Sequence, residues 1–277
     1  MTDNAQHALW NGLAGQAWVQ AQSLLDGMFA PFARLLAQAQ PAGAVQQVLD
    51  IGCGTGAVSL AIAARLGSGG HCTGVDIAAA MIERARQRAR DAGLEVDFVV
   101  ADAQRHAFAP ASVDRIVSRF GVMFFDDPVQ AFTRLRHATR HGGSLHALTW
   151  RSAAENAFMT TAERAAAPML TLPARDPDAP GQFAFADPDR VRAILTDSGW
   201  TELQLTAIDV PCQIPRRDLR TYISLLGPVG SALRSADIDA ATRARVLAAV
   251  EQAFAPFVEG DSVRFTAACW EVRASAG

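Results

Sequence analysis

The feature that most constrains this chain is a nine-residue run that begins like a buried strand and ends in three alternating glycines. The run is Val48-Leu49-Asp50-Ile51-Gly52-Cys53-Gly54-Thr55-Gly56. Residues 45–51 suit a buried strand, and residues 57–66 read as an apolar helix. Because glycine allows a tight turn and a close backbone approach to a ligand, the run predicts a nucleotide-type site at a helix N-terminus.

Carboxylates follow three successive predicted strands at equal spacing. Asp50 ends the first strand, Asp76 ends the strand at 71–75, and Asp102 follows the strand at 96–100. Each interval corresponds to one strand-plus-helix unit. The three acids should therefore meet at the carboxyl edge of a parallel sheet, where open α/β sheets bind their ligands.

The charge of these acids distinguishes between two kinds of nucleotide ligand. The pattern Gly52-x-Gly54-x-x-Ala57 also fits a relaxed dinucleotide fingerprint, so an NAD(P)-dependent oxidoreductase is one alternative. A pyrophosphate on this loop would meet the like charge of Asp50, whereas an ammonium and a sulfonium would be attracted. S-adenosylmethionine (SAM) carries both cations and has no phosphate. Its chemistry predicts Asp50 near the methionine amine, Asp76 at the ribose hydroxyls and Asp102 at the adenine amino group.

The series Asp50-x-Gly52-x-Gly54-x-Gly56, Asp76 and Asp102 resembles the class I SAM-dependent methyltransferases over about residues 45–150. More narrowly, it is similar to their small-molecule branch, which includes the quinone-biosynthesis C-methyltransferases. The resemblance implies a Rossmann-like methyltransferase fold with SAM as the cofactor. The predicted cofactor-binding residues are Asp50, Gly52, Cys53, Gly54, Gly56, Asp76, Ile77, Asp102, Ala103 and Arg119.

Alternating apolar strands and helices predict an α/β fold with a doubly wound, seven-stranded, mostly parallel sheet. The remaining strands are expected at 113–118, 145–150, 201–210 and 263–272. The expected helices are 18–39, 57–66, 78–92, 127–139, 155–167, 187–198, 217–226 and 239–257, and 171–185 is expected to be a loop. In the resembling fold, the seventh strand is antiparallel and lies between the fifth and sixth.

The chain is expected to carry a helical cap without a core of its own. Residues 1–42 should form an N-terminal helical lid, and residues 43–277 a SAM-binding α/β domain with cap insertions at about 152–186 and 214–260. Pro31 should bend or divide the helix at 18–39. Trp10 and Trp18 either touch the ligand or pack on the sheet. Such a cap excludes water and encloses a small substrate.

The segment after the fourth strand should lie at the same edge as the acids. Arg119 either pairs with a carboxylate of the cofactor or substrate, or forms a surface salt bridge with Asp126 or Asp127. The residues at 123–125 either wall the cavity or pack in the core. The segment has no Asn/Asp-Pro-Pro-aromatic run, which disfavours DNA-adenine and protein-glutamine substrates.

The sequence assigns no catalytic base. His146 lies inside the fifth strand, where a hydrogen-bonded core histidine is the expected role, and His106 is the other candidate base. Glu155 and Asn156 either meet the substrate or begin a helix. Tyr222, the only tyrosine, is expected to pack.

Composition excludes several classes of protein. A formal net charge of −3 and a pI near 6.1 disfavour a nucleic-acid partner. Arginines 84, 86, 88 and 90 are expected to form a solvated helix face. Four widely spaced cysteines without a CxxC pair predict neither disulfides nor a metal site, and favour the cytoplasm. No apolar run approaches membrane-spanning length.

The combined prediction is a cytoplasmic enzyme that transfers a methyl group from SAM to a small, largely apolar metabolite by in-line displacement. Its expected partner is this small-molecule substrate, and the sequence also allows a homodimer. An NAD(P)-dependent oxidoreductase and a non-catalytic SAM-binding protein are the alternatives.

Overall fold

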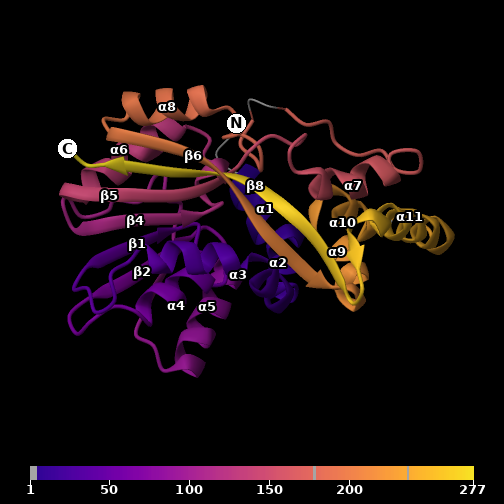
Figure 1. The fold of residues 1–277 in the computed structure, drawn as a ribbon, viewed down its shortest axis with the longest axis horizontal. Coiled ribbons are helices and arrows are strands. Elements are labelled where there is room, and N and C mark those ends of the chain that lie inside the picture. Colours follow the sequence, from indigo (N-terminus) through magenta and orange to yellow (C-terminus); the bar gives the residue numbers. More distant parts are fainter. Residues whose placement is uncertain (1–4, 177–178, 236) are drawn as a thin grey trace.

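A single mixed sheet organises the computed structural model, which describes residues 5–176, 179–235 and 237–277 (Figure 1). Its strand order is β3-β2-β1-β4-β5-β8-β6, and the short β7 pairs with β8. The strands are β1 Gln47–Ile51, β2 His71–Asp76, β3 Asp97–Val100, β4 Val113–Arg119, β5 Thr139–Trp150, β6 Thr201–Pro215, β7 Val258–Glu259 and β8 Ser262–Ser275. The first five are parallel, and β8 runs antiparallel to both β5 and β6.

The strand order confirms the predicted fold class, including the antiparallel last strand between the fifth and sixth strands. The chain runs outward from β1 through β2 to β3, and then returns to the other side of β1 to form β4. Because crossovers between parallel strands are right-handed, this reversal places the connecting helices on opposite faces of the sheet. The crevice between the carboxyl ends of β1 and β4 is the switch point of such a sheet.

The helices lie close to their expected positions in the sheet region. They are α1 Ala5–Asn11, α2 Leu13–Gln20, α3 Gln22–Gln38, α4 Ala57–Ala63, α5 Ala79–Ala92, α6 Pro128–Ala138, α7 Ala157–Ala166, α8 Pro188–Asp197, α9 Leu219–Leu225, α10 Gly227–Leu233 and α11 Ala240–Ala253. Short 3-10 turns occur at η1 Val122–Phe124, η2 Arg216–Asp218 and η3 Ala255–Phe257. Asp127 and Asp187 cap α6 and α8 ahead of a proline, as is common at a helix start.

Three expectations for the helices differ from the structure. Pro31 lies inside α3 and does not divide it. The break in the expected helix falls instead at Ala21, between α2 and α3. Helix α1 was not expected, and the second insertion contains α10 in addition to the two expected helices. No helix or strand occurs in the described part of 171–185, whose residues 177 and 178 lie outside the described residues.

Strands β6 and β8 extend beyond the other strands of the sheet, and α9, α10 and α11 lie at their far end (Figure 1). Both are longer than expected, and they remain paired to Pro215 and Ser262. Buried Cys212 and Ile214 alternate with exposed neighbours in the extension of β6. This period of two is that of a strand with one face covered.

An aromatic group joins α3 to the sheet. Phe29 and Phe32 pack edge-on against Phe120, with ring centroids 5.5 and 5.0 Å away. Phe120 stacks on Trp150 at 4.1 Å. The buried residues of α3, the sheet and the cap helices form one continuous cluster, so the cap shares the core of the sheet.

The arginines of α5 also fasten α3 and are not simply a solvated face. Arg88 Nη2 lies 2.5 Å from Asp26 Oδ2 in α3, and its Nη1 donates to the Thr55 carbonyl in the glycine loop. Arg84 donates to Gln22. Helix α3 is thereby tied to the glycine loop through one side chain.

No helix in the described ranges is long and apolar enough to cross a membrane.

Replacing Phe32 with alanine should destabilise the fold strongly. Phe32 is fully buried and contacts Phe29, Phe120 and Trp150. Truncating such a ring leaves a cavity, so we expect Phe32→Ala to lower the free energy of unfolding by about 3–5 kcal/mol in urea denaturation. Leu13→Ala, at an exposed apolar position, is the control. A loss below about 1 kcal/mol would show that α3 is dispensable to the core.

Candidate functional site

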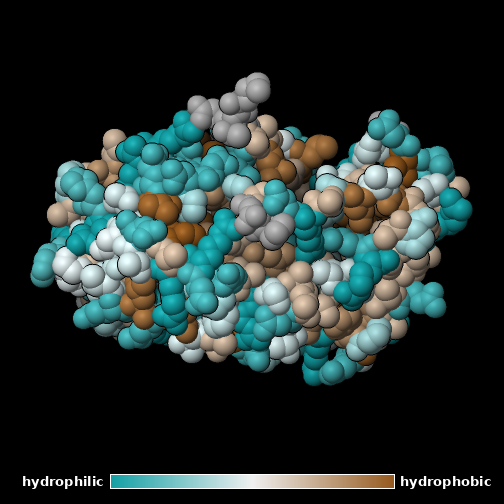
Figure 2. Space-filling view, turned by 90° about the horizontal axis from the view of Figure 1, so that it is seen from above, coloured by the Kyte–Doolittle hydropathy of each residue, from teal (hydrophilic) through white to brown (hydrophobic). Residues whose placement is uncertain are grey.

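A cavity of about 560 Å³ lies at the carboxyl edge of the parallel strands. Its floor is formed by the loops after β1, β2, β3 and β4, and its walls by α1–α3, α7, α9 and α10. Seen from above, hydrophobic side chains gather around an indentation between the sheet region and the helices carried by β6 and β8 (Figure 2). Residues of α1–α3 and of the segments 152–186 and 214–260 thus line one cavity together with the loops at the sheet edge.

The glycine loop forms the floor beside β1. Gly52, Gly54 and Gly56 have φ angles of +66°, +55° and +83°, which side chains adopt only with strain. A Cβ on Gly52 would lie 2.6 Å from the Cα of Gly121, in the loop after β4. Gly52 and Gly54 line the cavity, so backbone rather than side chain faces a ligand there.

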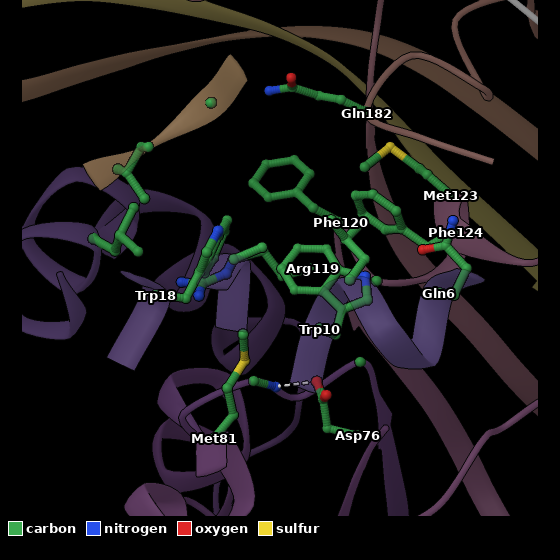
Figure 3. A pocket seen from close by; sticks show the side chains of 18 of the residues that line it. Gln6, Trp10, Trp18, Asp76, Met81, Arg119, Phe120, Met123, Phe124 and Gln182 are labelled. Atoms are coloured by element: carbon green, nitrogen blue, oxygen red, sulfur yellow. Dashed lines mark hydrogen bonds between the residues drawn. The ribbon is translucent and has the colours of Figure 1, made fainter. Parts of the chain in front are cut away.

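Asp76 lines the cavity at the end of β2 (Figure 3). Its Oδ2 accepts a hydrogen bond from Gly54 N at 2.8 Å, and its Oδ1 accepts one from Ala78 N at 2.9 Å. Burial raises the pKa of this carboxyl above its usual range, and these two donors oppose the rise. The carboxylate is held rigidly and retains lone pairs for hydroxyl donors.

Asp50 lies behind the loop and does not line the cavity. Its side chain is 1 % exposed, and its Oδ2 accepts a hydrogen bond from Ser59 Oγ at 2.6 Å. Burial raises the pKa of Asp50 to about 7, while Ser59 and the charge of Arg119 counteract the rise. Cys53 and Gly56 also lie outside the lining. Cys53 and Gly56 belong to the loop itself, and direct contact of these three residues with a cofactor stays a prediction.

Asp102 and Ala103 line the cavity after β3. Asp102 Oδ1 accepts a hydrogen bond from Gln104 N at 2.9 Å, and its Oδ2 lies 3.3 Å from Arg105 Nε. Gln104, which the sequence analysis missed, also lines the cavity, and its Oε1 accepts from Asp127 N at the start of α6. Its position two residues after Asp102 was the only available signal. Asp50 in β1, Asp76 at the end of β2 and Asp102 just after β3 therefore lie at the carboxyl ends of three adjacent strands, along one edge of the sheet.

Arg119 ends β4 and lines the cavity. Its Nη1 is buried and has no hydrogen-bond partner among the described residues, and its Cζ lies 5.6 Å from the centre of the Phe29 ring. Burial lowers the pKa of Arg119, which the charges of Asp26 and Asp50 raise. Arg119 lines the cavity and, within the described residues, forms no ion pair with Asp126 or Asp127, so the alternative of a surface salt bridge is wrong.

Aromatic and sulfur-containing side chains form the walls around this floor (Figure 3). Trp10 packs edge-on against Phe124 and Trp18, with ring centroids 5.1 and 5.9 Å away. Met123 and Phe125 also line the cavity. Both tryptophans and the whole 123–125 segment thus belong to the cavity wall.

Helix α1 is held over the cavity by the amide of Asn11, which the sequence analysis did not single out. Asn11 Nδ2 donates to the Ile77 carbonyl at 3.0 Å, and Asn11 Oδ1 accepts from Ala79 N at 3.1 Å. Ile77 itself lines the cavity. One side chain therefore joins the lid to the loop that follows Asp76.

The other candidate polar residues lie outside the cavity lining. His146 Nε2 lies 2.8 Å from Glu271 Oε1, and burial lowers its pKa to about 4, which confirms its expected role in the core. Glu155 pairs with Arg151. Asn156 is buried, bonds Ala268 and immediately precedes α7, so of its two expected roles the start of a helix is the one that the structure bears out. His106 packs against Phe108.

The residues around the cavity fit the chemistry of SAM. Asp76 and Asp102 offer acceptors on the sheet edge, and no group of three metal-ligating side chains occurs within the described ranges. Arg119 Nη1 and Gln6 Oε1 are buried polar atoms of cavity-lining residues without a partner in the described part of the chain. Unpaired buried groups of this kind are costly unless a ligand satisfies them. A cation for a carboxylate and acceptors for hydroxyl or amino groups are all present.

Comparison with known proteins matches residues 48–143 to the family model described as "Methyltransferase domain". Aklanonic acid methyltransferase DauC of Streptomyces sp. (strain C5) is 36% identical over 135 residues, which cover 47% of this chain and 61% of DauC. Ubiquinone/menaquinone biosynthesis C-methyltransferase UbiE of Bdellovibrio bacteriovorus is 35% identical over 107 residues, covering 39% of this chain and 45% of UbiE.

A solved structure shares the fold. The putative methyltransferase BH2331 of Bacillus halodurans C-125 superposes with a TM-score of 0.57 and 16% identity, covering 88% of this chain and 98% of that one. The curated relatives named above are matched over less than two thirds of their own length. The methyltransferase match over the glycine loop and all three acids favours SAM over a dinucleotide at this site.

The pH dependence of stability should report the buried carboxyl of Asp50. Its pKa is raised from 3.8 to about 7, so the folded protein holds a proton that the unfolded chain releases. The stability contributed by that proton is complete below about pH 4 and is lost as the pH rises to about 7. The free energy of unfolding of the wild type relative to Asp50→Asn should therefore fall by up to about 1.4 kcal/mol per pH unit over this window. A pH-independent difference would contradict the assignment.

Proposed function

We propose that the chain is a class I SAM-dependent methyltransferase that transfers a methyl group from SAM to a small, largely apolar metabolite, because the methyltransferase-domain model matches residues 48–143 and relatives such as DauC and UbiE are named methyltransferases. The observation that carries the proposal is one cavity bounded by the glycine loop, Asp76, Asp102 and a set of apolar walls. Acceptors for the cofactor lie on the sheet edge, and apolar side chains lie opposite them in the cap.

We assign the cofactor contacts from the sheet edge. Asp76 accepts from the ribose hydroxyls, Asp102 and Ala103 face the adenine, and Gly52, Gly54 and Ile77 contact the cofactor. Arg119 pairs with the cofactor's carboxylate, because its Nη1 is buried without a partner next to this floor. Asp50, in its ionised form, attracts the methionine amine from behind the loop. Cys53 and Gly56 shape the same loop.

SAM, when bound, supplies a methyl group on a positively charged sulfur, which an acceptor atom displaces in line. The protein then has to hold the acceptor opposite the sulfur and keep water out. Alignment of this kind is worth roughly 7–11 kcal/mol in favourable cases. Trp10, Trp18, Phe124 and the cap helices enclose the cavity and would provide this alignment. No lining histidine is available as a base among the described residues.

The names of the relatives support a small-molecule acceptor. DauC is named for aklanonic acid, and UbiE for ubiquinone and menaquinone biosynthesis. We propose for this chain a small-molecule methyl acceptor as a class, and no particular compound.

The proposal includes the division into a lid at 1–42 and a domain at 43–277 with two cap insertions. It also includes a cytoplasmic location, which the four free, buried cysteines support.

Removing the Asp76 carboxylate should abolish cofactor binding. Calorimetry with S-adenosylhomocysteine should show a dissociation constant raised at least about 100-fold in Asp76→Ala, because hydrogen bonds to a charged group are worth about 1.5–3 kcal/mol each. Asp91→Ala, an exposed carboxylate on α5, is the control. Equal binding by wild type and Asp76→Ala would overturn the assignment. Thermal stabilisation by NAD(P), without stabilisation by S-adenosylhomocysteine, would support an NAD(P)-dependent oxidoreductase instead.

Arg119 can be tested separately from the rest of the site. Arg119→Met keeps much of the side-chain length without the charge, so it should weaken S-adenosylhomocysteine by roughly 10- to 100-fold, as expected for loss of a charged hydrogen bond. Binding of 5′-methylthioadenosine, which lacks the carboxylate, should be unchanged. If both ligands bind equally more weakly, Arg119 supports the fold and does not bind the carboxylate.

Incubation with labelled SAM and a cell extract distinguishes an enzyme from a non-catalytic SAM-binding protein. An enzyme transfers the label to a small molecule of the extract, whereas a non-catalytic binder does not.

A further inference from the structure

Two polar side chains of the cap point to a recognition site within the cavity, away from the sheet edge. Glu163 lies on α7 and Tyr222 on α9, and both line the cavity. They come from the two separate insertions, so the chain brings them together only when the cap is assembled. Their lining neighbours in the same helices are apolar: Phe158, Met159, Ala162, Ile223 and Leu225.

Glu163 is a fixed acceptor with its charge largely offset. Its Oε1 lies 2.5 Å from Arg175 Nη2, and Arg175 Cζ lies 4.8 Å above the ring of Phe183. Its side chain is 21% exposed. Its Oε2 makes no hydrogen bond in the described part of the chain. One carboxylate oxygen is therefore occupied and the other is free to accept.

Tyr222 offers a donor in the lining of the same cavity. Its ring packs edge-on against Phe254, with centroids 6.1 Å apart, and its hydroxyl has no hydrogen-bond partner within the described ranges. Burial, followed by the charge of Glu163, raises the pKa of Tyr222, which keeps the phenol protonated at every physiological pH. The hydroxyl therefore remains a donor.

The other polar lining residues of the cap are engaged in part. Gln182 Nε2 donates to Met159 Sδ, and Arg234 Nη1 donates to the carbonyls of Ser224 and Leu225 at the end of α9, whereas Arg234 Nε is buried without a partner in the described part of the chain. Ser231 is exposed. Glu163 and Tyr222 together present a free carboxylate oxygen and a free hydroxyl donor to a ligand.

We propose that Glu163 and Tyr222 recognise a hydroxyl group on an otherwise apolar methyl acceptor, an inference that rests on the proposed function. A hydroxyl group both donates and accepts, so it satisfies Glu163 Oε2 and the Tyr222 hydroxyl together. A ligand carboxylate has no proton to donate to Glu163 Oε2, and a ligand ammonium can accept nothing from the Tyr222 hydroxyl. Glu163 and Tyr222 are specificity-determining residues of the cap, and neither takes part in the transfer itself.

The test uses three probes of one shape, namely naphthalene, 2-naphthol and 2-naphthoate, with the full chain saturated with S-adenosylhomocysteine. Dissociation constants come from ligand-observed NMR titration. Two hydrogen bonds of ordinary net strength predict that wild type binds 2-naphthol about 10-fold more tightly than naphthalene, and that 2-naphthoate binds worst. Tyr222→Phe and Glu163→Gln should each reduce the preference for 2-naphthol to about 3-fold or less, with naphthalene unchanged.

The control is Glu251→Gln, because Glu251 is a cap carboxylate that also pairs with an arginine, Arg220, but does not line the cavity. It should keep the wild-type preference. Equal binding of naphthalene and 2-naphthol to wild type, absence of binding by all three, or preference for 2-naphthoate would each overturn the inference. Binding of S-adenosylhomocysteine, measured on the same samples, tests the proposed function separately. A variant that still binds this product analogue has kept its fold, so its loss of preference is a local effect.

Discussion

The close approach of the backbone at the carboxyl ends of β1 and β4 is the constraint on which the site depends. Gly52 and Gly121 face each other, and a Cβ on Gly121 would lie 2.6 Å from the Ile51 carbonyl oxygen. The Ser118 hydroxyl donates to the same carbonyl at 2.8 Å and accepts from Gly121 N, so one side chain joins both strand ends. A larger residue at either glycine would force the strands apart and displace the cavity floor, which begins at this contact.

The sheet edge with the glycine loop and the three acids could be predicted from the sequence, because the residues that define it form short local patterns that recur after successive strands. Asp50, Asp76 and Asp102 each lie at or just beyond the carboxyl end of a strand, and parallel strands bring such positions to one edge whatever the details of their packing. The left-handed φ values at Gly52, Gly54 and Gly56 likewise need glycine whichever helix follows. Fold class and this edge were therefore predictable without knowledge of any tertiary contact, whereas the place of the last strand was predicted only through the family resemblance.

The cap half depends on contacts between residues far apart in the chain, so the sequence showed less of it. Nothing in the local sequence indicates that Asn11 bonds the loop after Asp76, or that Arg88 reaches both Asp26 and Thr55. Pro31 illustrates the opposite error, since tertiary packing of a largely buried helix maintains α3 through a residue that usually interrupts one. Asp50 was placed at the correct edge, but its hydrogen bond to Ser59 turns it away from the cavity.

The placement of β8 between β5 and β6 affects how the chain can fold during synthesis. Strand β6 is synthesised before the segment 216–261, and β8 is synthesised after it. Until β8 has been made, β6 and the edge of β5 that pairs with β8 both lack their partner strand. At ribosomal speeds of about 5–20 residues per second, these two edges stay open on the order of seconds. Open edges invite pairing with other chains. Nascent molecules of this protein are therefore vulnerable to aggregation at one defined stage, and a chaperone that shields β5 would be most useful then.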